Sequence, residues 1–457
     1  MNTASLTVAV EGAPSEPTRL TWGQTAILHA MRWMGEEQHY FNHPCTVTFP
    51  EAVPIAQVAE ALRRLVSEAQ VMRTLFTDGP EGPRQTVQGG GEMRFNLVQT
   101  GRRAVDDICL RVESELKPLP FGDDDWPVRG TIVCSGDEAL ALVWVFKHHA
   151  VDGSARDLIT SRFLQLVEDP ATSETWDAVQ PVEQAAYERS SEARSLSRTA
   201  CRYWSSVLQR APKTQFQRRN PPAGRRFVRY GLSSAALSSA ATAISARLNV
   251  SASSVLLATA TAALASLTAR NEPVFQLIVG NRNGDRHSKV ATAMAQNGIM
   301  AVSVAGLDFD QLVRRCARTS LLGYRSGFHD PDDLSALREQ REREHGKADV
   351  SAYFNDARRR PDWPEAETAV SRQQLQSLRE ETEIFPVGEW DRQDAAVFIH
   401  TTFHPRNGEL YLMADTSCID RSAIPTMLRA MENVLVSSAF SPLSADQMPA
   451  VFPPAFP

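Results

Sequence analysis

The sequence has little of what marks several classes of protein. Its six cysteines are spread over 457 residues and include no Cys-x-x-Cys pair, so neither a zinc site nor a disulfide framework is indicated. Acidic residues outnumber basic ones by 54 to 48, a net charge of -6, and nucleic-acid-binding proteins show the opposite balance. We therefore expect a protein of the reducing cytoplasm that binds neither nucleic acid nor a metal ion.

Long apolar runs are also missing. The longest, residues 255–267, is shorter than a membrane span and contains Thr259, Thr261 and Ser266. Residues 1–17 lack the basic start and the apolar core of a signal peptide. We expect the apolar run to form a buried helix, and no membrane association is predicted.

The length and composition are typical of a soluble globular protein with two domains. Hydrophobic residues make up 42% of the chain and charged residues 22%. The helical pattern that follows residue 153 breaks at the polar stretch 168–173, so we place the boundary between Asp169 and Gln184. The expected domains are residues 1–176 and 177–457.

Two adjacent histidines follow a predicted buried strand. Residues 143–146 are Val-Trp-Val-Phe, and a turn signal precedes this run at residues 135–137. Lys147, His148 and His149 come next, and apolar residues at helical spacing begin after Gly153. The histidines are therefore expected on a strand-loop-helix corner.

The residue types at this corner favour proton transfer. A neutral imidazole titrates near pH 6.5 and can take a proton from an attacking amine or hydroxyl. Because neighbouring strand residues face opposite ways, only one of His148 and His149 is expected to enter a cavity. Asp152, next to Gly153, could turn the backbone and pair with a distant arginine, which would fix the imidazole. A metal hydrolase is the weakest interpretation, because the sequence has no HExxH or comparable ligand set.

This corner resembles the signature of the condensation domains of nonribosomal peptide synthetases, HHxxxDG, whose second histidine is catalytic. Counting back from Asp152, that histidine is His148, and Lys147 stands in place of the first. Either the first histidine has been replaced, as in the wider HxxxD acyltransferases, or the loop is one residue shorter and His149 is the base. We favour the first interpretation because those acyltransferases share the His-x-x-x-Asp-Gly part.

The resemblance covers about residues 20 to 440. It includes an LTxxQ opening at residues 20–24, a Tyr-Trp pair at 203–204 and a strand 349–356 that matches the vsFN element at Asn355. Some positions depart from the family: residues 68–70 are Glu-Ala-Gln in place of Arg-His-Glu, and Val302 replaces an asparagine.

The resemblance implies a fold of the α/β (α+β) class, in which two lobes like chloramphenicol acetyltransferase form a V-shaped pseudo-dimer around a central tunnel. It also implies a function, transfer of an acyl or aminoacyl group to an amine or hydroxyl in nonribosomal peptide or antibiotic biosynthesis. The donor would be a thioester on the phosphopantetheine of an acyl or peptidyl carrier protein. The acceptor would be a free small molecule or a second group bound to a carrier protein. The sequence shows no carrier motif and no room for an adenylation domain, so we expect a free-standing monomeric enzyme that binds no cofactor of its own.

Roles for single residues also come from the resemblance. His148 would be the base, with His149 as the alternative, and Asp152 would be structural. Arg282 is the first candidate for its ion-pair partner and Arg73 the second. Gly153 belongs to the motif and Asn355 would line the tunnel.

Two further functions remain open. One is a coenzyme A-dependent acyltransferase of the same superfamily, although the glycines at 89–91 lack the Lys-Ser/Thr of a phosphate loop. The other is a non-catalytic recruitment module, which the replacements at Lys147, Glu68 and Val302 would suit.

Overall fold

The computed structural model describes residues 4–80, 82–218, 224–358, 370–404 and 407–453. Its contacts divide the chain into two compact units. Unit 1 consists of Met1–Ser195 and Gly280–Gln296, and unit 2 of Leu196–Val279 and Asn297–Pro457. We call Gly280–Gln296 the inserted segment. We had expected residues 177–195 and the inserted segment in the second domain. Both belong to unit 1 because they pack with the first domain although they are far from it in sequence.

Unit 1 is built on a five-stranded sheet that carries the histidine corner at the end of one strand. In this sheet β6 and β7 are parallel and the other neighbours antiparallel. Every residue of β8 from Ala139 to Phe146 is buried, which is the reason for its unbroken apolar sequence. The strands lie in the order β1 (Ser5–Glu11), β6 (Gly90–Gln99), β7 (Val128–Ser135), β8 (Glu138–Phe146) and β3 (His43–Pro54).

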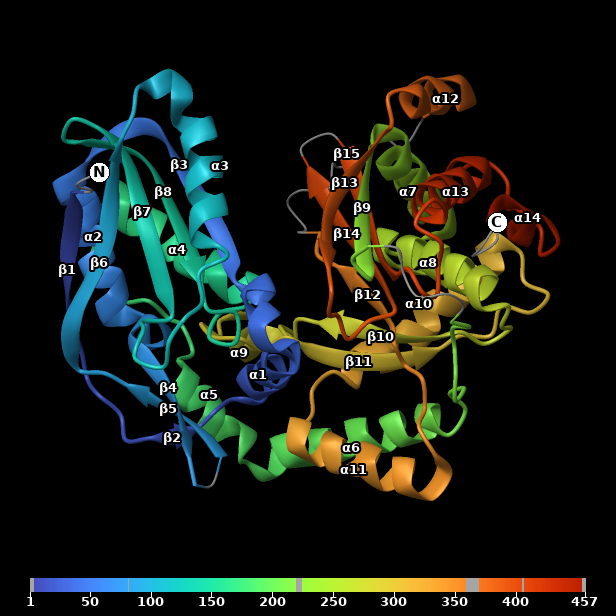
Figure 1. Ribbon diagram of the computed structural model, residues 1–457, viewed down its shortest axis with the longest axis horizontal. Coiled ribbons are helices and arrows are strands. Elements are labelled where there is room, and N and C mark those ends of the chain that lie inside the picture. The colour runs from blue at the N-terminus through green and yellow to red at the C-terminus, as the bar shows by residue number, and fades with distance from the viewer. Residues whose placement is uncertain (1–3, 81, 219–223, 359–369, 405–406, 454–457) are drawn as a thin grey trace. The chain divides into compact units, whose positions relative to one another are not determined.

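Helices cover both faces of this sheet (Figure 1). α2 (Ile55–Glu68) and α4 (Gly153–Glu168) pack on one face, and α3 (Val105–Leu116) packs on the other. The remaining elements of unit 1 are α1 (Trp22–Met34), α5 (Pro181–Glu188), α9 (Gly284–Ser288), the 3-10 turns η1 (Gly35–Phe41), η2 (Gln70–Arg73) and η3 (Arg102–Ala104), and a small sheet of β2 (Thr18–Arg19), β5 (Gly82–Val87) and β4 (Thr74–Gly79). The chain passes into unit 2 within α6 (Ser191–Leu208).

Unit 2 is built on a seven-stranded mixed sheet. β10, β12 and β14 are parallel, and β14, β15, β9 and β13 are antiparallel. The order is β11 (Gln296–Ala301), β10 (Val274–Val279), β12 (Ala352–Asp356), β14 (Val397–His404), β15 (Asn407–Asp415), β9 (Phe227–Ser234) and β13 (Glu383–Trp390). The helices of this unit are α7 (Ala235–Leu248), α8 (Ala252–Thr268), α10 (Phe309–Arg325), α11 (Pro331–His345), α12 (Arg372–Glu380), α13 (Ala423–Ser438) and α14 (Gln447–Val451).

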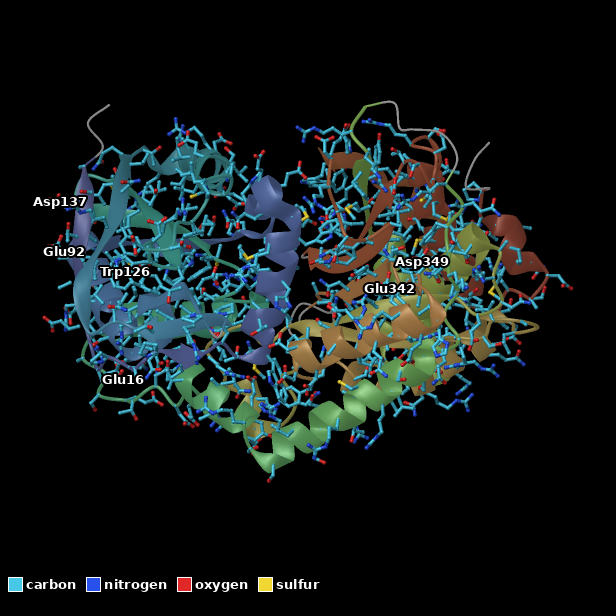
Figure 2. All side chains as sticks on the ribbon, turned by 60° about the horizontal axis from the view of Figure 1, so that its bottom comes forward. Glu16, Glu92, Trp126, Asp137, Glu342 and Asp349 are labelled. Carbon is cyan, nitrogen blue, oxygen red and sulfur yellow. The ribbon has the colours of Figure 1, made fainter. Side chains whose placement is uncertain are left out.

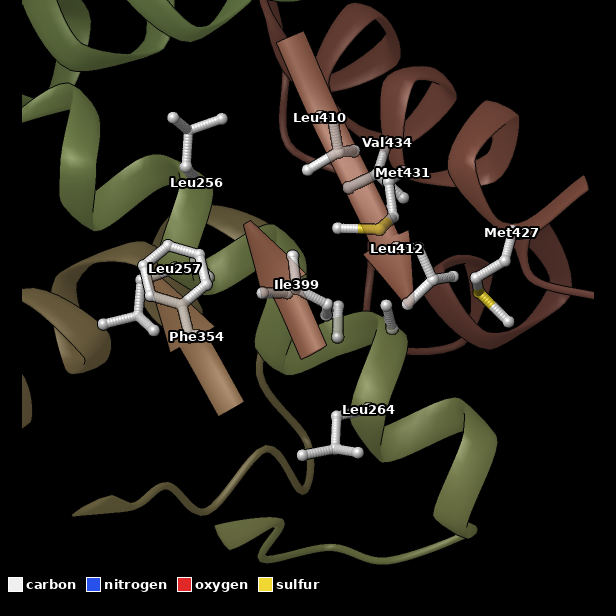
Figure 3. Packing of buried hydrophobic residues seen from close by; sticks show 14 of the residues in the cluster. Leu256, Leu257, Leu264, Phe354, Ile399, Leu410, Leu412, Met427, Met431 and Val434 are labelled. Carbon is white, nitrogen blue, oxygen red and sulfur yellow. The ribbon is translucent and has the colours of Figure 1, made fainter. Parts of the chain in front are cut away.

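The core of unit 2 lies between this sheet and α7, α8, α10 and α13 (Figure 3). Ile399, Leu410 and Leu412 point from the strands into this helical layer. Residues 255–264 are all buried, as the apolar run predicted for a buried helix. No single helix in the described residues is long and apolar enough to span a membrane. Among the described residues, the bent pair of α7 and α8 passes that test when the two helices are taken together, with a bend of 110° between them.

Charged side chains lie mainly at the surface, as the charged fraction of the sequence leads one to expect. Glu16 and Asp137 on unit 1 and Glu342 on unit 2 are exposed examples (Figure 2).

Candidate functional site

The histidine corner joins the end of β8 to the start of α4. β8 ends at Phe146, and the backbone N–H groups of Ala150 and Val151 both donate to the carbonyl of Lys147. The two histidines therefore lie in a turn beyond the strand, so strand alternation is the wrong reason for their different directions. Asp152 caps α4, since its Oδ1 accepts a hydrogen bond from the backbone N–H of Ala155 at 2.9 Å.

One ring nitrogen of His148 donates a hydrogen bond, and the other keeps a free lone pair. Its Nδ1 lies 3.2 Å from the carbonyl oxygen of Val151. A carbonyl can only accept, so the neutral ring carries its proton on Nδ1 and leaves the lone pair on Nε2. Burial lowers the pKa of His148, while the Val151 carbonyl and Asp152 oppose this effect. The ring is therefore neutral at pH 7 and able to accept a proton.

Two ring side chains, one from the end of η1 and one from the start of β3, border His148. Phe41 stacks on it with ring centroids 6.0 Å apart, and His43 meets it edge to face at 5.3 Å. Nδ1 of His43 lies 3.3 Å from Nη1 of Arg156, which can only donate, so the proton of His43 is on Nε2. Burial holds the pKa of His43 well below its usual value, and His148 and Arg156 add to the effect. The site therefore contains a second neutral imidazole with an N–H donor.

The sequence reasoning missed His43 and Arg156. His43 comes close to the corner because it pairs with Phe146, the last residue of β8. Only the pairing of β3 with β8 could have indicated this, and one sequence does not reveal that pairing.

His149 is in different surroundings from His148. It is 1% exposed, and its ring centroid lies 4.3 Å from that of Phe76. Neither ring nitrogen has a hydrogen-bond partner among the described residues. Burial holds the pKa of His149 well below its usual value, with Lys147 as the next cause. His149 thus lies against an aromatic side chain, whereas His148 is half-buried and hydrogen-bonded.

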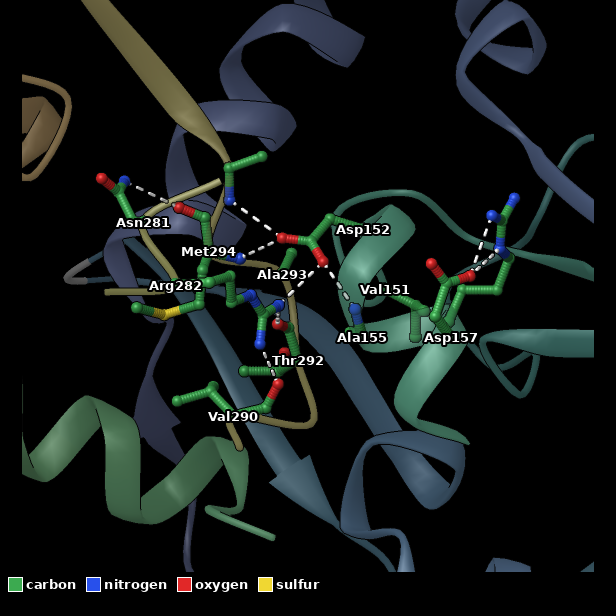
Figure 4. A network of polar contacts seen from close by, with 12 residues as sticks. Val151, Asp152, Ala155, Asp157, Asn281, Arg282, Val290, Thr292, Ala293 and Met294 are labelled. Atoms are coloured by element: carbon green, nitrogen blue, oxygen red, sulfur yellow. Dashed lines mark hydrogen bonds and ion pairs between the residues drawn. The ribbon is translucent and has the colours of Figure 1, made fainter. Parts of the chain in front are cut away.

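Asp152 links the corner to the inserted segment (Figure 4). Its Oδ1 accepts from Nη2 of Arg282 at 2.8 Å in addition to the capping bond from Ala155. Its Oδ2 accepts from the backbone N–H groups of Met294 and Ala295 at 2.7 and 3.0 Å. Asp152 is 2% exposed. Its carboxylate accepts four hydrogen bonds in all, and these compensate for the loss of contact with water.

Arg282 is held in turn by the backbone of its own segment. Its Nη2 also donates to the carbonyl of Thr292 at 2.7 Å, and its Nη1 donates to that of Val290. The backbone N–H of Ala293 and the hydroxyl of Thr292 donate to the carbonyl of Ala150 at 3.0 and 2.9 Å. These bonds fix the loop between the histidines and Asp152.

Arg73, the second expected partner of Asp152, lies elsewhere. Its Nη1 donates to the carbonyls of Ala13 and Gln88 at 2.9 and 2.6 Å. It is 3% exposed, and burial lowers its pKa. Arg73 therefore ties together backbone next to the small sheet and does not pair with Asp152.

The LTxxQ opening also contacts the inserted segment. Thr21 and Gln24 form a capping box at the start of α1. Nε2 of Gln24 donates to the hydroxyl of Thr292 at 3.0 Å, and the hydroxyl of Thr21 donates to the carbonyl of Ala293 at 3.3 Å. A side chain at Gly23 would have a Cβ only 2.4 Å from that carbonyl oxygen. The glycine is required here because the backbones approach so closely.

Two of the departures from the family pattern have structural consequences. Lys147 is 8% exposed, and its Nζ donates to the carbonyl of Gly122 at 3.2 Å. Glu68 forms a bidentate ion pair with Arg162, at 2.7 and 2.9 Å. Both replacements are accommodated by local partners.

Gly153 and Asn355 lie in different units. Gly153 is the first residue of α4, and a Cβ there would lie 3.5 Å from Nε2 of His43. Asn355 is on β12 of unit 2, where its Nδ2 donates to Nδ1 of His400 at 3.1 Å. Within the described parts of the chain, no group of three or more His, Cys, Asp or Glu side chains could hold a metal ion.

Comparison with solved structures shows which known folds this one resembles. The condensation domain of the monacolin K polyketide synthase MokA superposes with a TM-score of 0.73 at 15% identity, covering 95% of this chain and 100% of that one. SgcC5 from Streptomyces globisporus gives 0.71 at 14% identity, covering 93% and 100%. The condensation domain that mediates chain release from the enacyloxin polyketide synthase gives 0.69 at 17% identity, covering 96% and 84%. These identities are low, so the likeness shows the fold.

Sequence comparison supplies the family. No curated protein matches the chain in sequence. The family model described as Condensation domain matches residues 20–343, well over half of the chain. That stretch includes the LTxxQ opening, the histidine corner and the inserted segment with Arg282. The chain belongs to the condensation-domain family.

Proposed function

We propose that the protein is a free-standing condensation enzyme. It transfers an acyl or aminoacyl group from the phosphopantetheine thioester of an acyl or peptidyl carrier protein to an amine or hydroxyl, and so forms an amide or an ester in natural-product biosynthesis. Membership of a family whose members are generally acyltransferases supports the reaction class. The observation that carries the proposal is the hydrogen bond from Nδ1 of His148 to Val151, which leaves Nε2 able to accept a proton.

In the proposed mechanism His148 is the general base. Nε2 takes a proton from the acceptor as the acceptor nitrogen or oxygen bonds to the thioester carbon. The carbon-sulfur bond then breaks, and the thiolate of the pantetheine arm receives the proton from His148. General-base catalysis of this kind typically accelerates a reaction by about 10² to 10⁴. The low pKa of His148 suits this role, because the ring is unprotonated before the acceptor arrives.

Asp152 is a positioning residue in this mechanism. Its carboxylate is fully occupied by Ala155, Arg282, Met294 and Ala295, so it holds the loop that carries His148. Gly153 starts the helix behind this loop. The V-shaped arrangement of two lobes and the tunnel, with Asn355 among its lining residues, belong to the same proposal, as does the cytoplasmic location.

A reaction with acyl-loaded carrier proteins tests the proposal. Carriers encoded beside this protein would be loaded with defined acyl groups and mixed with enzyme and candidate amines or alcohols. Mass spectrometry should show loss of the acyl group from the carrier and a product of the combined mass. His148→Ala should abolish this product. Carrier binding without transfer by the wild-type protein would instead favour a recruitment module.

A coenzyme A ester is the alternative donor. One structural neighbour, the starter condensation domain of rhizomide synthetase RzmA, has been solved in complex with C8-CoA. It superposes with a TM-score of 0.69 at 14% identity and covers 94% of this chain. The same acyl group presented on a carrier and on coenzyme A distinguishes the two donors.

A further inference from the structure

A row of side chains crosses the sheet of unit 2 on the face that points away from α7, α8 and α13. Asn355 is opposite His400, His400 is opposite Tyr411, and Tyr411 is opposite Gly231, which is also opposite Phe385. Residues directly opposite each other share a face, and Ile399 and Leu410 beside this row point into the helical core. The row therefore lies on the other side of the sheet.

Gly231 leaves room for two aromatic rings in this row. A Cβ at this position would lie 2.7 Å from the ring of Phe385 and 2.9 Å from the ring of Tyr411. The two rings meet edge to face, with centroids 6.3 Å apart. They therefore form an aromatic surface over the glycine.

Arg229 lies beside this aromatic surface and has no counter-ion among the described residues. Its guanidinium carbon is 4.5 Å from the ring centroid of Tyr411, a cation-π contact. It is half-buried, and within the described parts of the chain no carboxylate forms an ion pair with it. Three other partly buried arginines of unit 2 do have such partners: Arg226 with Asp415, Arg358 with Asp356, and Arg429 with Glu432. A shielded charge without a counter-ion is costly, so this position suits an anion from outside.

The acidic residue on the same side of this strand, Glu409, is bound by Tyr411 and not by Arg229. The hydroxyl of Tyr411 donates to Glu409 at 2.8 Å. Arg229 is opposite Met413, four residues from Glu409 along β15, which corresponds to about 13 Å of extended strand. Tyr411 lies between them. Within the described residues, the carboxylate of Glu409 therefore forms no ion pair with Arg229.

His400 adds a neutral donor on β14, directly opposite Tyr411. Its ring centroid is 5.8 Å from that of Tyr411. Because Nδ2 of Asn355 donates to Nδ1 of His400, the proton of the ring is on Nε2. Burial, with a smaller effect from Arg229, lowers the pKa of His400 to about 3. At pH 7 this ring offers an N–H donor without adding a charge.

We propose that Arg229 and His400 form a binding site for the carboxylate of a small-molecule ligand, with Tyr411 and Phe385 contacting its apolar part. One guanidinium matches one carboxylate in charge and can bind it through two parallel hydrogen bonds. The site needs no acyl transfer to be tested, so it stands or falls separately from the proposed reaction.

The experiment is a titration of the full-length protein, labelled at its histidines, with acetate. NMR resonances of His400 are identified by their loss in His400→Gln, and acetamide of the same shape serves as the uncharged probe. Acetate should shift the His400 resonances saturably, whereas acetamide should not. Arg229→Gln should weaken acetate binding at least about tenfold, since a charged hydrogen bond is lost.

Two variants control for charge and for folding. Arg318→Gln removes a charge from an exposed position on α10 and should bind acetate like the wild type. Arg229→Lys keeps the charge without the planar fork and should show intermediate binding, which covers the case that Arg229→Gln does not fold. The proposal is overturned by an acetate response that does not saturate, that acetamide reproduces, or that Arg229→Gln and Arg229→Lys both keep at wild-type strength.

Discussion

The carboxylate of Asp152 and the guanidinium of Arg282 lie 2.8 Å apart, although 130 residues separate them in the sequence. Both side chains are buried or nearly so, with exposed fractions of 3% and 13%. Arg282 brings the inserted segment against the histidine corner, and the backbone of that segment completes the set of donors around Asp152. The ion pair therefore connects the loop of His148 to residues that follow it far along the chain.

Asp152→Ala is expected to destabilise the fold as well as to lower activity. Removing one partner of a buried ion pair leaves an uncompensated charge and costs roughly 3 to 5 kcal/mol. Urea unfolding followed by circular dichroism measures this loss. Glu60→Gln is the matched control, because Glu60 pairs with Arg63 at the exposed surface and such pairs contribute about 0 to 1 kcal/mol. Unchanged stability of Asp152→Ala, together with lost activity, would point to a direct chemical role.

The two histidines should differ in their effect on acyl transfer. His148→Ala is expected to abolish it, because the proton acceptor at Nε2 is lost. His149→Ala should keep a substantial fraction, since this ring lies against Phe76 and has no described hydrogen-bond partner. Single-turnover rates with a loaded carrier compare the two. A near wild-type rate for His148→Ala with loss in His149→Ala would reverse the assignment.

The protein should lose stability in mild acid. Burial holds the pKa of His149 and His43 well below the usual 6.5 and lowers that of His329 to about 4. Below pH 6.5 the unfolded chain binds protons at these rings while the folded chain does not. The free energy of unfolding is therefore largest above pH 6.5. Below that pH it falls by about 1.4 kcal/mol per pH unit for each such histidine.

Unfolding experiments between pH 7 and pH 5 measure this slope. His149→Phe should make it shallower, because one buried neutral imidazole has been removed. A variant with the wild-type slope would show that His149 does not contribute.

A carrier-bound thioester should be a better donor than the same acyl group on coenzyme A. The chain is mildly acidic and its sequence shows no glycine-rich phosphate loop or clustered Lys/Arg motif of the kind that grips nucleotide phosphates. Selectivity should then come from docking of the carrier protein, and kcat/KM for the carrier-bound donor should be much higher. Equal or better kinetics with free acyl-coenzyme A would assign the protein to the coenzyme A-dependent branch.

The sequence by itself determined the local elements of the site. The apolar run of β8 and the helical spacing after Gly153 predicted a strand-loop-helix corner, and the structure has one. These features depend on periodicity and on hydrogen bonds between residues close in sequence, so one sequence suffices to predict them. The match to the family motif came from the same few residues.

Tertiary structure alone decided what surrounds His148. His43 reaches it through the pairing of β3 with β8, and Arg282 reaches Asp152 because the inserted segment packs with unit 1. The directions of His148 and His149 follow from a turn that β8 does not include, so strand alternation could not predict them. Each of these contacts joins residues whose closeness depends on how strands and segments pair across the fold, and no local pattern in the sequence encodes that pairing.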